Sequence, residues 1–171
     1  KSTDPLGGDA NACCAAQMFL ASGDGVVFRG AAGPWYTPST KEYHLDRQAA
    51  AALMGLVVSE YRLRHGGQPP AELFIHGRAR FGEEEWAGFG SVVPSETNLV
   101  GVQIREAKYE LKLFREGRYP VLRGTVFKLS PRSAFLWTSG FVPRLGTYIG
   151  PETPNPIMVT MQKGESNLDT V

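Results

Sequence analysis

The stretch ELFIHGRAR at residues 72–80 begins with apolar residues and ends with polar and basic ones. A segment with helical periodicity precedes it, so the pattern predicts a central strand at residues 73–75, buried on both faces and reached through a crossover helix. Ligands of open α/β sheets bind at the carboxyl ends of such strands. This end carries His76, Gly77 and Arg78, with no carboxylate. A two-metal nuclease needs hard oxygen ligands there, so the sequence argues against that chemistry.

The helix before this stretch has recognisable ends. Asp46 is placed as its N-cap, and the helix is expected to run to Arg64. Gly66 and Gly67 then terminate it. Its alanine content predicts close packing on a sheet. The apolar positions that recur at helical spacing are Ala49, Leu53, Leu56, Val57 and Tyr61.

Further elements follow from alternation and turn residues. Residues 14–20 and 26–30 flank Ser-Gly-Asp-Gly and predict an antiparallel hairpin, because the Asp-Gly step suits a tight turn. A second helix begins at the three glutamates of residues 83–85, whose charges complement the helix dipole. The other predicted strands are residues 42–45, 99–104, the hairpin 125–129 with 134–138, and residues 157–161.

Composition places the chain among globular proteins of ordinary character. It has 171 residues, 42% of them hydrophobic and 20% charged, which is enough for one domain with a real core. No apolar run is long enough to cross a membrane, and no signal pattern opens the chain. The adjacent Cys13 and Cys14 would point to opposite faces of a strand, so we expect reduced thiols and a cytoplasmic protein.

The net charge of +1 hides a basic block in the middle of the chain. Residues 100–148 hold nine Lys and Arg against three Asp and Glu, a balance of +6. Residues 109–114 alternate in polarity, and several arginines then surround Tyr119 in a segment broken by Gly117 and Pro120. This mixture suits a surface that follows phosphates, because Arg makes bidentate contacts with them. A solvated basic face is the simpler alternative.

Five collinear blocks of the sequence resemble the PIWI domain of prokaryotic Argonautes, particularly the short type. Combinations such as KLFR followed by YPVLRG make the resemblance specific, and it runs through nearly the whole chain. The blocks are CCAAQMFLASGDGVVFRGAAGPWY at residues 13–36, AELFIHGRARFGEEEWAGF at 71–89, YELKLFREGRYPVLRGT at 109–125, LWTSGFVPRLGTYIG at 136–150 and ETPNPIMV at 152–159.

The resemblance implies an α/β fold with a ribonuclease H-like mixed sheet flanked by helices. It also implies nucleic-acid recognition that is directed by a guide strand. Such a domain, with a preceding MID domain, holds a guide, here expected to be RNA, and its complementary target, expected to be DNA. Base pairing then supplies sequence choice. Active Argonautes cut the target with carboxylates and two metals, one carboxylate lying in an Arg-Asp-Gly motif after the strand equivalent to residues 73–75. His76 and Gly77 stand at the corresponding positions.

The missing carboxylate implies a nuclease-inactive domain, and neither a catalytic nor a metal-binding residue is assigned. The mobile glutamate of active enzymes would fall near Asp46, without a match that assigns it. Short Argonautes act in prokaryotic defence with a partner that carries a TIR- or Sir2-type effector and an APAZ region. No cofactor is expected within the chain, although Mg could accompany the guide 5′ phosphate in the full-length protein.

The resemblance also implies that residues 1–171 form one PIWI-like domain segment, incomplete at both ends. The first strand, the MID domain and the C-terminal helix would lie outside it. A sheet without its first strand exposes unpaired edges, so we expect this segment alone to aggregate. A sharp cooperative melt of a soluble monomer would contradict this expectation.

The candidate nucleic-acid contacts are all basic side chains. Arg78 and Arg80 stand at the strand end, where fixed charge could replace the charge of a metal. The phosphate-contacting candidates are Lys112, Arg115, Arg118 and Arg123, with His76, Arg78 and Arg144 as further candidates.

Two other functions remain open from the sequence. An active metal-dependent nuclease could use Asp24, Asp46 or residues 83–85, although a turn, a cap and a helix dipole are the better explanations of these acids. A docking module for an effector protein could use the aromatic loop at Trp35 and Tyr36.

Overall fold

The computed structural model describes residues 2–3, 12–20, 22–37, 39, 41–107, 111–146, 148 and 153–166. The chain divides into two compact units. Unit 1 comprises Lys1–Leu73 and Phe81–Leu99, and unit 2 comprises Phe74–Arg80 and Val100–Val171. Among the described residues, no helix combines the length and apolar character needed to cross a membrane.

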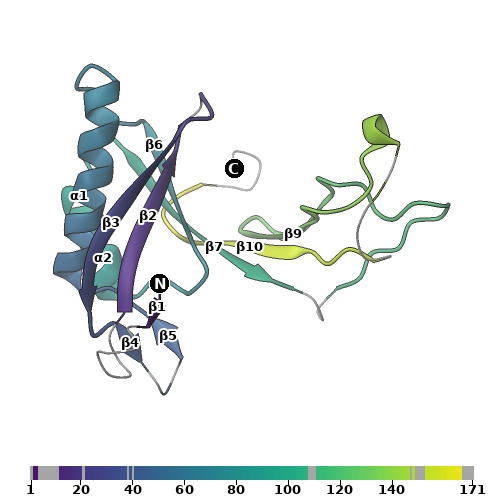
Figure 1. Cartoon of the computed structure of the whole chain (residues 1–171), viewed down its shortest axis with the longest axis horizontal. Coiled ribbons are helices and arrows are strands. Elements are labelled where there is room, and N and C mark those ends of the chain that lie inside the picture. Colours follow the sequence, from purple (N-terminus) through teal and green to yellow (C-terminus); the bar gives the residue numbers. More distant parts are fainter. Residues whose placement is uncertain are drawn as a thin grey trace. The chain divides into compact units, whose positions relative to one another are not determined.

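Unit 1 contains an antiparallel three-stranded sheet in the order β1-β2-β3 (Figure 1). Its strands are β1 (Ser2–Thr3), β2 (Ala12–Phe19) and β3 (Gly25–Gly33). The predicted hairpin is therefore confirmed. Cys13 is exposed and Cys14 is buried, as expected for neighbours on a strand, so the two thiols are not joined in a disulfide.

Helix α1 (Arg47–Arg64) contacts β2 and β3. Asp46 caps it as predicted, its Oδ1 accepting the Ala49 N–H at 2.7 Å. The chain leaves the helix through a hydrogen bond of 2.8 Å from Gly67 N to Arg62 O. A Cβ on Gly30 of β3 would lie 3.5 Å from Leu53 Cδ1, so the helix does pack closely on this strand.

The buried face of α1 differs from the predicted one. Leu56, one of the apolar positions predicted at helical spacing, is 49% exposed. Leu53 and Val57 are buried, so the buried face is rotated about the helix axis and still contains these two predicted positions. The buried residues are Ala50, Leu53, Met54, Val57 and Val58.

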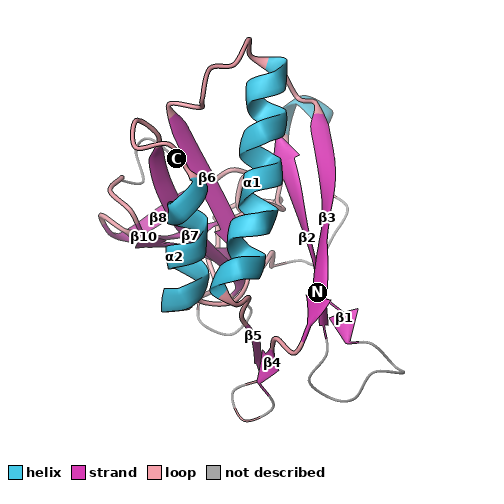
Figure 2. Ribbon diagram, turned by 90° about the vertical axis from the view of Figure 1, so that its left-hand side faces the viewer, coloured by secondary structure: helices cyan, strands magenta, loops and turns pink. Residues whose placement is uncertain are grey.

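Helix α2 (Glu83–Val92) lies beside α1 in unit 1 (Figure 2). Gly88 makes the close approach possible, because a Cβ there would lie 2.4 Å from Arg47 O. A small hairpin of β4 (Tyr36–Thr37) and β5 (Glu42–Tyr43) precedes α1. The predicted strand at residues 42–45 is thus shorter than expected.

Unit 2 is built on a five-stranded sheet in the order β6-β7-β10-β9-β8. Strand β10 pairs antiparallel with both β7 and β9. The strands predicted at 99–104, 125–129, 134–138 and 157–161 are confirmed with small shifts of their ends. The observed bounds are β6 (Glu72–Gly77), β7 (Asn98–Glu106), β8 (Val126–Ser130), β9 (Ser133–Leu136) and β10 (Ile157–Lys163).

The position predicted for the residue 73–75 strand is wrong. Within the described chain, β6 stands at an end of the sheet order and its apolar residues are only half-buried. Phe74 packs against the core formed by Val100, Val102 and Met161, which covers one side of the strand. An unbroken apolar run does not show whether both edges of a strand are paired, so the sequence pattern could not place it.

A second core cluster in unit 2 surrounds Trp137, which is fully buried. Its indole Nε1 donates to Pro154 O at 3.2 Å, so the buried polar atom is satisfied. Ala107, Val121 and Phe135 complete this cluster. It supports the loops that carry most of the predicted contact residues.

Candidate nucleic-acid interface

The segment that begins at Leu111 belongs to no strand in the described residues. Leu111 and Leu113 are half-buried and pack on the Trp137 cluster. Lys112 and Phe114 face solvent, and Phe114 is 78% exposed. The predicted alternation therefore survives as alternating burial. Residues 108–110 lie outside the described residues, so the start of this segment cannot be compared with the prediction.

Tyr119 and Phe141 form a parallel stacked pair at the centre of the loop region. Their ring centroids are 4.1 Å apart and their planes differ by 5°. Backbone hydrogen bonds fix the pair, since Phe141 N donates to Val121 O at 2.9 Å and Arg123 N donates to Phe141 O at 3.1 Å. The Tyr119 hydroxyl donates to Gly146 O at 3.3 Å.

Two predicted contact residues lie over these rings. The Arg115 guanidinium carbon is 5.9 Å from the Phe141 centroid, and that of Arg118 is 5.7 Å from the Tyr119 centroid. Such cation–π contacts contribute on the order of 0.5–1 kcal/mol at exposed sites. They also restrict the long side chains. Arg115, Arg118, Tyr119 and Phe141 are called the aromatic–arginine cluster below.

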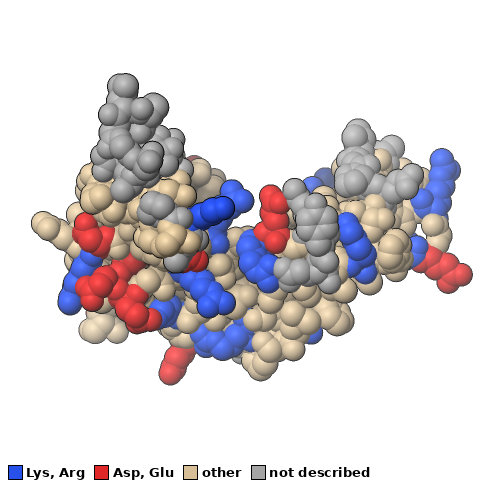
Figure 3. Space-filling model, turned by 90° about the horizontal axis from the view of Figure 1, so that it is seen from below, with Lys and Arg blue, Asp and Glu red and all other residues tan. Residues whose placement is uncertain are grey.

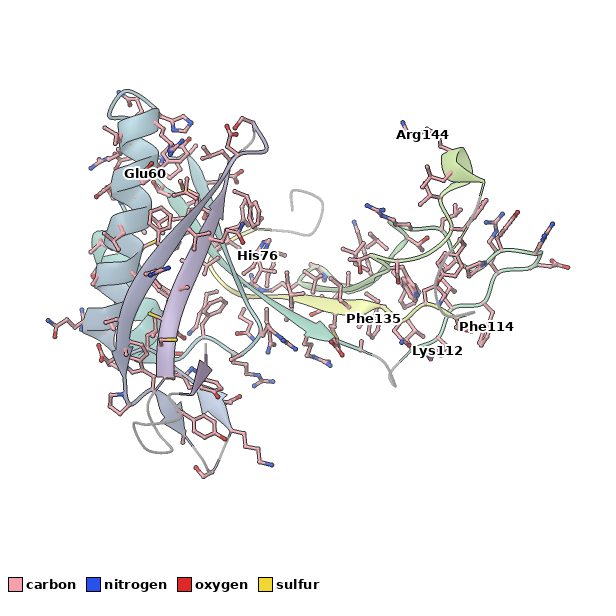
Figure 4. All side chains as sticks on the ribbon, viewed as in Figure 1. Glu60, His76, Lys112, Phe114, Phe135 and Arg144 are labelled. Atoms are coloured by element: carbon pink, nitrogen blue, oxygen red, sulfur yellow. The ribbon has the colours of Figure 1, made fainter. Side chains whose placement is uncertain are left out.

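The other predicted contact residues differ in how they are connected to this cluster. Arg123 follows it directly, through the backbone hydrogen bond to Phe141. Arg144 lies on the short 3-10 helix η1 (Pro143–Leu145), which ends beside the carbonyl that Tyr119 contacts. Lys112 donates to Asn155 Oδ1. Figure 4 shows Lys112 next to Phe114, with Arg144 and His76 well separated from Lys112 and from each other.

His76 and Arg78 therefore belong to another part of unit 2. The Arg78 carbonyl accepts a hydrogen bond of 3.0 Å from Gln103 Nε2, and Gln103 Oε1 accepts one of 2.7 Å from Gln162. Partial burial of its imidazole lowers the pKa of His76, although the residue as a whole is exposed. This burial favours the neutral imidazole of His76 in the ligand-free protein.

On the face drawn in Figure 3, blue Lys and Arg groups lie among uncharged side chains and red acidic ones. Between Glu116 and Glu152 the sequence nevertheless contains no Asp or Glu. The loops that follow Glu116 therefore carry positive charge without an acidic residue, whereas Glu116 itself lies between Arg115 and Arg118 of the cluster.

The acids considered for metal catalysis lie in unit 1 and have local structural contacts. Asp24 accepts the Ser22 hydroxyl at 2.8 Å in the β2–β3 turn. The Ala49 N–H, and then the Trp35 indole, hold the pKa of Asp46 below its usual value. Within the described residues, no three His, Cys, Asp or Glu side chains are arranged to hold a metal ion.

Glu85 makes specific side-chain contacts in addition to the predicted interaction with the helix dipole. Its side chain is buried, and Oε1 accepts the Leu45 N–H at 3.2 Å. Its other oxygen is 3.6 Å from His44 Nδ1. This carboxylate therefore ties the start of α2 to the residues before α1, whereas Glu83 and Glu84 remain exposed in the first turn.

The predicted aromatic contact at Trp35 is wrong. Trp35 is only 7% exposed, and its Nε1 donates to Asp46 Oδ2 at 3.2 Å. Tyr36 stacks on Tyr43 across the β4–β5 hairpin with a centroid distance of 4.7 Å. The loop is apolar because it packs against its own unit.

The sequence did not single out Phe114, which is exposed, or Phe141, which belongs to the aromatic–arginine cluster. Phe141 was assigned to a loop, and its pairing with Tyr119 connects positions 22 residues apart. The alternation from Leu111 was a signal for the outward position of Phe114. No local pattern pairs Phe141 with Tyr119, because that contact depends on tertiary structure.

Two solved structures that share this fold are structures of Argonautes. Aa-Ago, in a crystal structure with externally bound siRNA, matches at a TM-score of 0.57 and 21% identity, over 97% of this chain and 21% of that chain. Clostridium butyricum Argonaute, bound to a guide DNA and a 19-mer target DNA, matches at 0.53 and 13%, over 84% of this chain and 18% of that chain. No protein-family model and no curated protein sequence matches the chain.

These comparisons confirm the predicted fold class. The chain has an α/β fold of the ribonuclease H-like type, similar to a PIWI-like segment of Argonaute structures. It spans about a fifth of the length of each structure that it matches.

Proposed function

We propose that this chain is a nucleic-acid-binding segment of an Argonaute-like protein that holds a guide strand paired with its target without cutting it. The observation that carries the proposal is the aromatic–arginine cluster, displayed on a fold shared with Argonautes. One of those structures contains siRNA and the other contains guide and target DNA. Both ligands have a phosphate backbone, and the guanidinium groups of the cluster are suited to bind phosphates.

The stacked rings give the arginines a defined role in this proposal. An Arg side chain carries about 2 kcal/mol of rotamer entropy, part of which is lost when it grips a phosphate. Contact with the Phe141 and Tyr119 rings restricts Arg115 and Arg118 before the ligand arrives. Each guanidinium keeps donors at its edge for phosphate oxygens. The nucleic-acid backbone is thus held without readout of its bases.

Absence of cleavage is the second part of the proposal. It rests on His76 and Gly77, which occupy the strand end where a metal-binding carboxylate is expected in active Argonautes. The acids of the alternative mechanism make turn, cap and packing contacts in unit 1. Signalling from an inactive domain then requires a partner, for which a TIR- or Sir2-type effector with an APAZ region in cytoplasmic defence is the proposed class.

Binding can be tested by fluorescence anisotropy with a labelled RNA guide paired to a DNA target, using the full-length protein over a series of salt concentrations. Arg115→Gln and Arg118→Gln should each weaken binding and reduce the salt slope by about one. Arg62→Gln, at an exposed position on α1, is the matched control and should leave both quantities unchanged. Equal behaviour of all three variants would contradict a role for the cluster.

Tyr119 separates the effect of the stack from that of the charges. Tyr119→Phe keeps the ring and should retain affinity, whereas Tyr119→Leu removes the surface under Arg118 and should weaken binding several-fold. Both lose the hydroxyl that donates to Gly146 O, so their difference reports the ring. Similar losses in both variants would assign the effect to the hydrogen bond instead.

Cleavage is tested with the same complex. Matched target is incubated with Mg or Mn, and the products are separated on a denaturing gel. We expect the target to be retained intact. Guide-dependent cutting would contradict the inactive assignment and favour the metal-dependent nuclease, for which Asp24→Ala and Asp46→Ala would be the first variants.

A further inference from the structure

Strand β8 forms one end of the five-stranded sheet and is unusually apolar for an exposed edge. All five of its residues are exposed, among them Val126 at 52%, Phe127 at 51% and Leu129 at 50%. In the described part of the chain, β9 is its sheet neighbour and nothing follows β8 in the strand order. Edges of this kind pair readily with another extended chain unless charge, proline or a bulge prevents it.

The register shows which backbone groups are directed outward. Trp137 N donates to Thr125 O at 2.9 Å, and the ladder continues with Val126 opposite Leu136 and Phe127 opposite Phe135. Hydrogen-bonded and non-hydrogen-bonded pairs alternate along an antiparallel ladder. Val126 is therefore in a non-hydrogen-bonded pair, and its N–H and C=O point away from β9 toward the open edge.

The part of β8 suited to pairing is its first half. The register shifts between Lys128 and Ser130, which interrupts the regular edge at Leu129. Val126 to Lys128 remain in register. A short extended segment could therefore add to the sheet there, with its apolar side chains on the face of Phe127 and the alternate side chains on the face of Val126 and Lys128.

The charge around this edge selects the occupant. The sequence between Glu116 and Glu152 contains Lys128 and Arg132 in the hairpin and no acidic residue. The Arg132 guanidinium donates to the carbonyls of Met161 and Gly164. Two copies of β8 paired together would bring like charges across the new ladder, which is unfavourable.

We propose that β8 docks an extended segment of a partner protein in which apolar residues alternate with Asp or Glu, so that the sheet gains a strand. Main-chain hydrogen bonds supply affinity in such strand addition, and alternate side chains supply specificity. The three exposed apolar side chains favour a protein strand over nucleic acid, whose backbone offers them nothing to pack against. This docking is independent of the proposed nucleic-acid binding.

The probe is a short fluorescein-labelled peptide in which Val alternates with Glu or Asp, measured by anisotropy against the full-length protein. Val126→Pro removes the outward N–H, and proline is tolerated at the first residue of an edge strand. We expect about tenfold weaker peptide binding, because the variant loses one main-chain hydrogen bond to the peptide. Val126→Thr keeps the N–H and the branched side chain, and should bind like the unchanged protein.

Side-chain variants test the proposal without altering the backbone. Phe127→Ser should weaken the acidic peptide, and Lys128→Glu should weaken it while improving a peptide with Lys at every acidic position. If Val126→Pro fails to fold by circular dichroism, these two variants decide the outcome. Affinity for the acidic peptide that is unchanged in both Phe127→Ser and Lys128→Glu would overturn the proposal.

Other occupants predict different results. Loss of guide–target binding in Val126→Pro, or competition between peptide and oligonucleotide, would assign the edge to nucleic acid. A concentration-dependent dimer that disappears in Val126→Pro but not in Val126→Thr would assign it to a second copy of the protein. Absence of any acidic-peptide binding would refute the docking site. If Val126→Pro loses peptide binding while its affinity for the oligonucleotide is unchanged, the proposal is supported.

Discussion

The contact between α1 and α2 can be tested by adding a single methyl group at Gly88. A Cβ at this position would lie 2.4 Å from Arg47 O and 2.8 Å from Ala50 Cβ. Ordinary contacts between heavy atoms are about 3.5–4.0 Å, so the helices would have to separate by on the order of 1 Å. Overpacking of this kind costs about 1–3 kcal/mol. Alanine returns about 1 kcal/mol through its higher helix propensity, so Gly88→Ala should lose up to roughly 2 kcal/mol of stability.

Gly90 provides a matched control in the same helix. A Cβ at Gly90 would meet nothing within 4 Å. Gly90→Ala should therefore gain about 1 kcal/mol from helix propensity alone. The two variants have the same composition, so the difference between their unfolding free energies isolates the contact of Gly88 with α1.

Urea unfolding followed by Trp fluorescence is a suitable assay, because Trp86 lies on α2. The midpoint should fall in Gly88→Ala and rise in Gly90→Ala, with the slope unchanged in both. Equal midpoints in the two variants would refute the close approach of the helices at Gly88. A gain in both would show that α1 yields without cost.

Three further predictions concern the candidate interface and two titrating groups. Phe114→Ala should weaken single-stranded oligonucleotide binding by about 1–3 kcal/mol if the exposed ring stacks on a base, and unchanged affinity would remove Phe114 from the interface. Asp46→Ala should lower the melting temperature at neutral pH, and the difference should vanish in acid: the lowered pKa of Asp46 gives stability that is lost as pH falls through it. Burial lowers the pKa of His76, so the unfolded chain binds this proton more readily than the folded protein does. The stability linked to the neutral side chain is therefore present above the ordinary His pKa and is lost as pH falls through the lowered value. The urea midpoint should therefore decline less in His76→Gln than in the unchanged protein between about pH 7 and pH 5.

Elements defined by local chemistry were predictable from the sequence. The β2–β3 hairpin follows from a Ser-Gly-Asp-Gly turn between apolar runs, and α1 is capped by Asp46 and ends before Gly66 as the capping signals indicate. In each case the deciding interactions join residues within a few positions of one another. The alternation from Leu111 likewise predicted which side chains are buried, even without a strand.

Elements defined by distant partners were not predictable in the same way. The apolar run of β6 indicated a strand but not its place at an end of the described sheet. Trp35 resembled an exposed aromatic contact until its hydrogen bond to Asp46 placed it in the core of its own unit. Both outcomes depend on what the remainder of the chain brings beside these residues.

The sequence by itself determined the order of the helices and strands, the basic character of residues 100–148 and the absence of a carboxylate at His76 and Gly77. The tertiary structure decided that Tyr119 stacks on Phe141, that two guanidiniums lie over these rings, and that β8 presents an apolar edge. The physical reason is the range of the interactions. Turn preferences, caps and net charge depend on neighbours in the chain, whereas stacking and edge exposure depend on contacts between segments that only folding brings together.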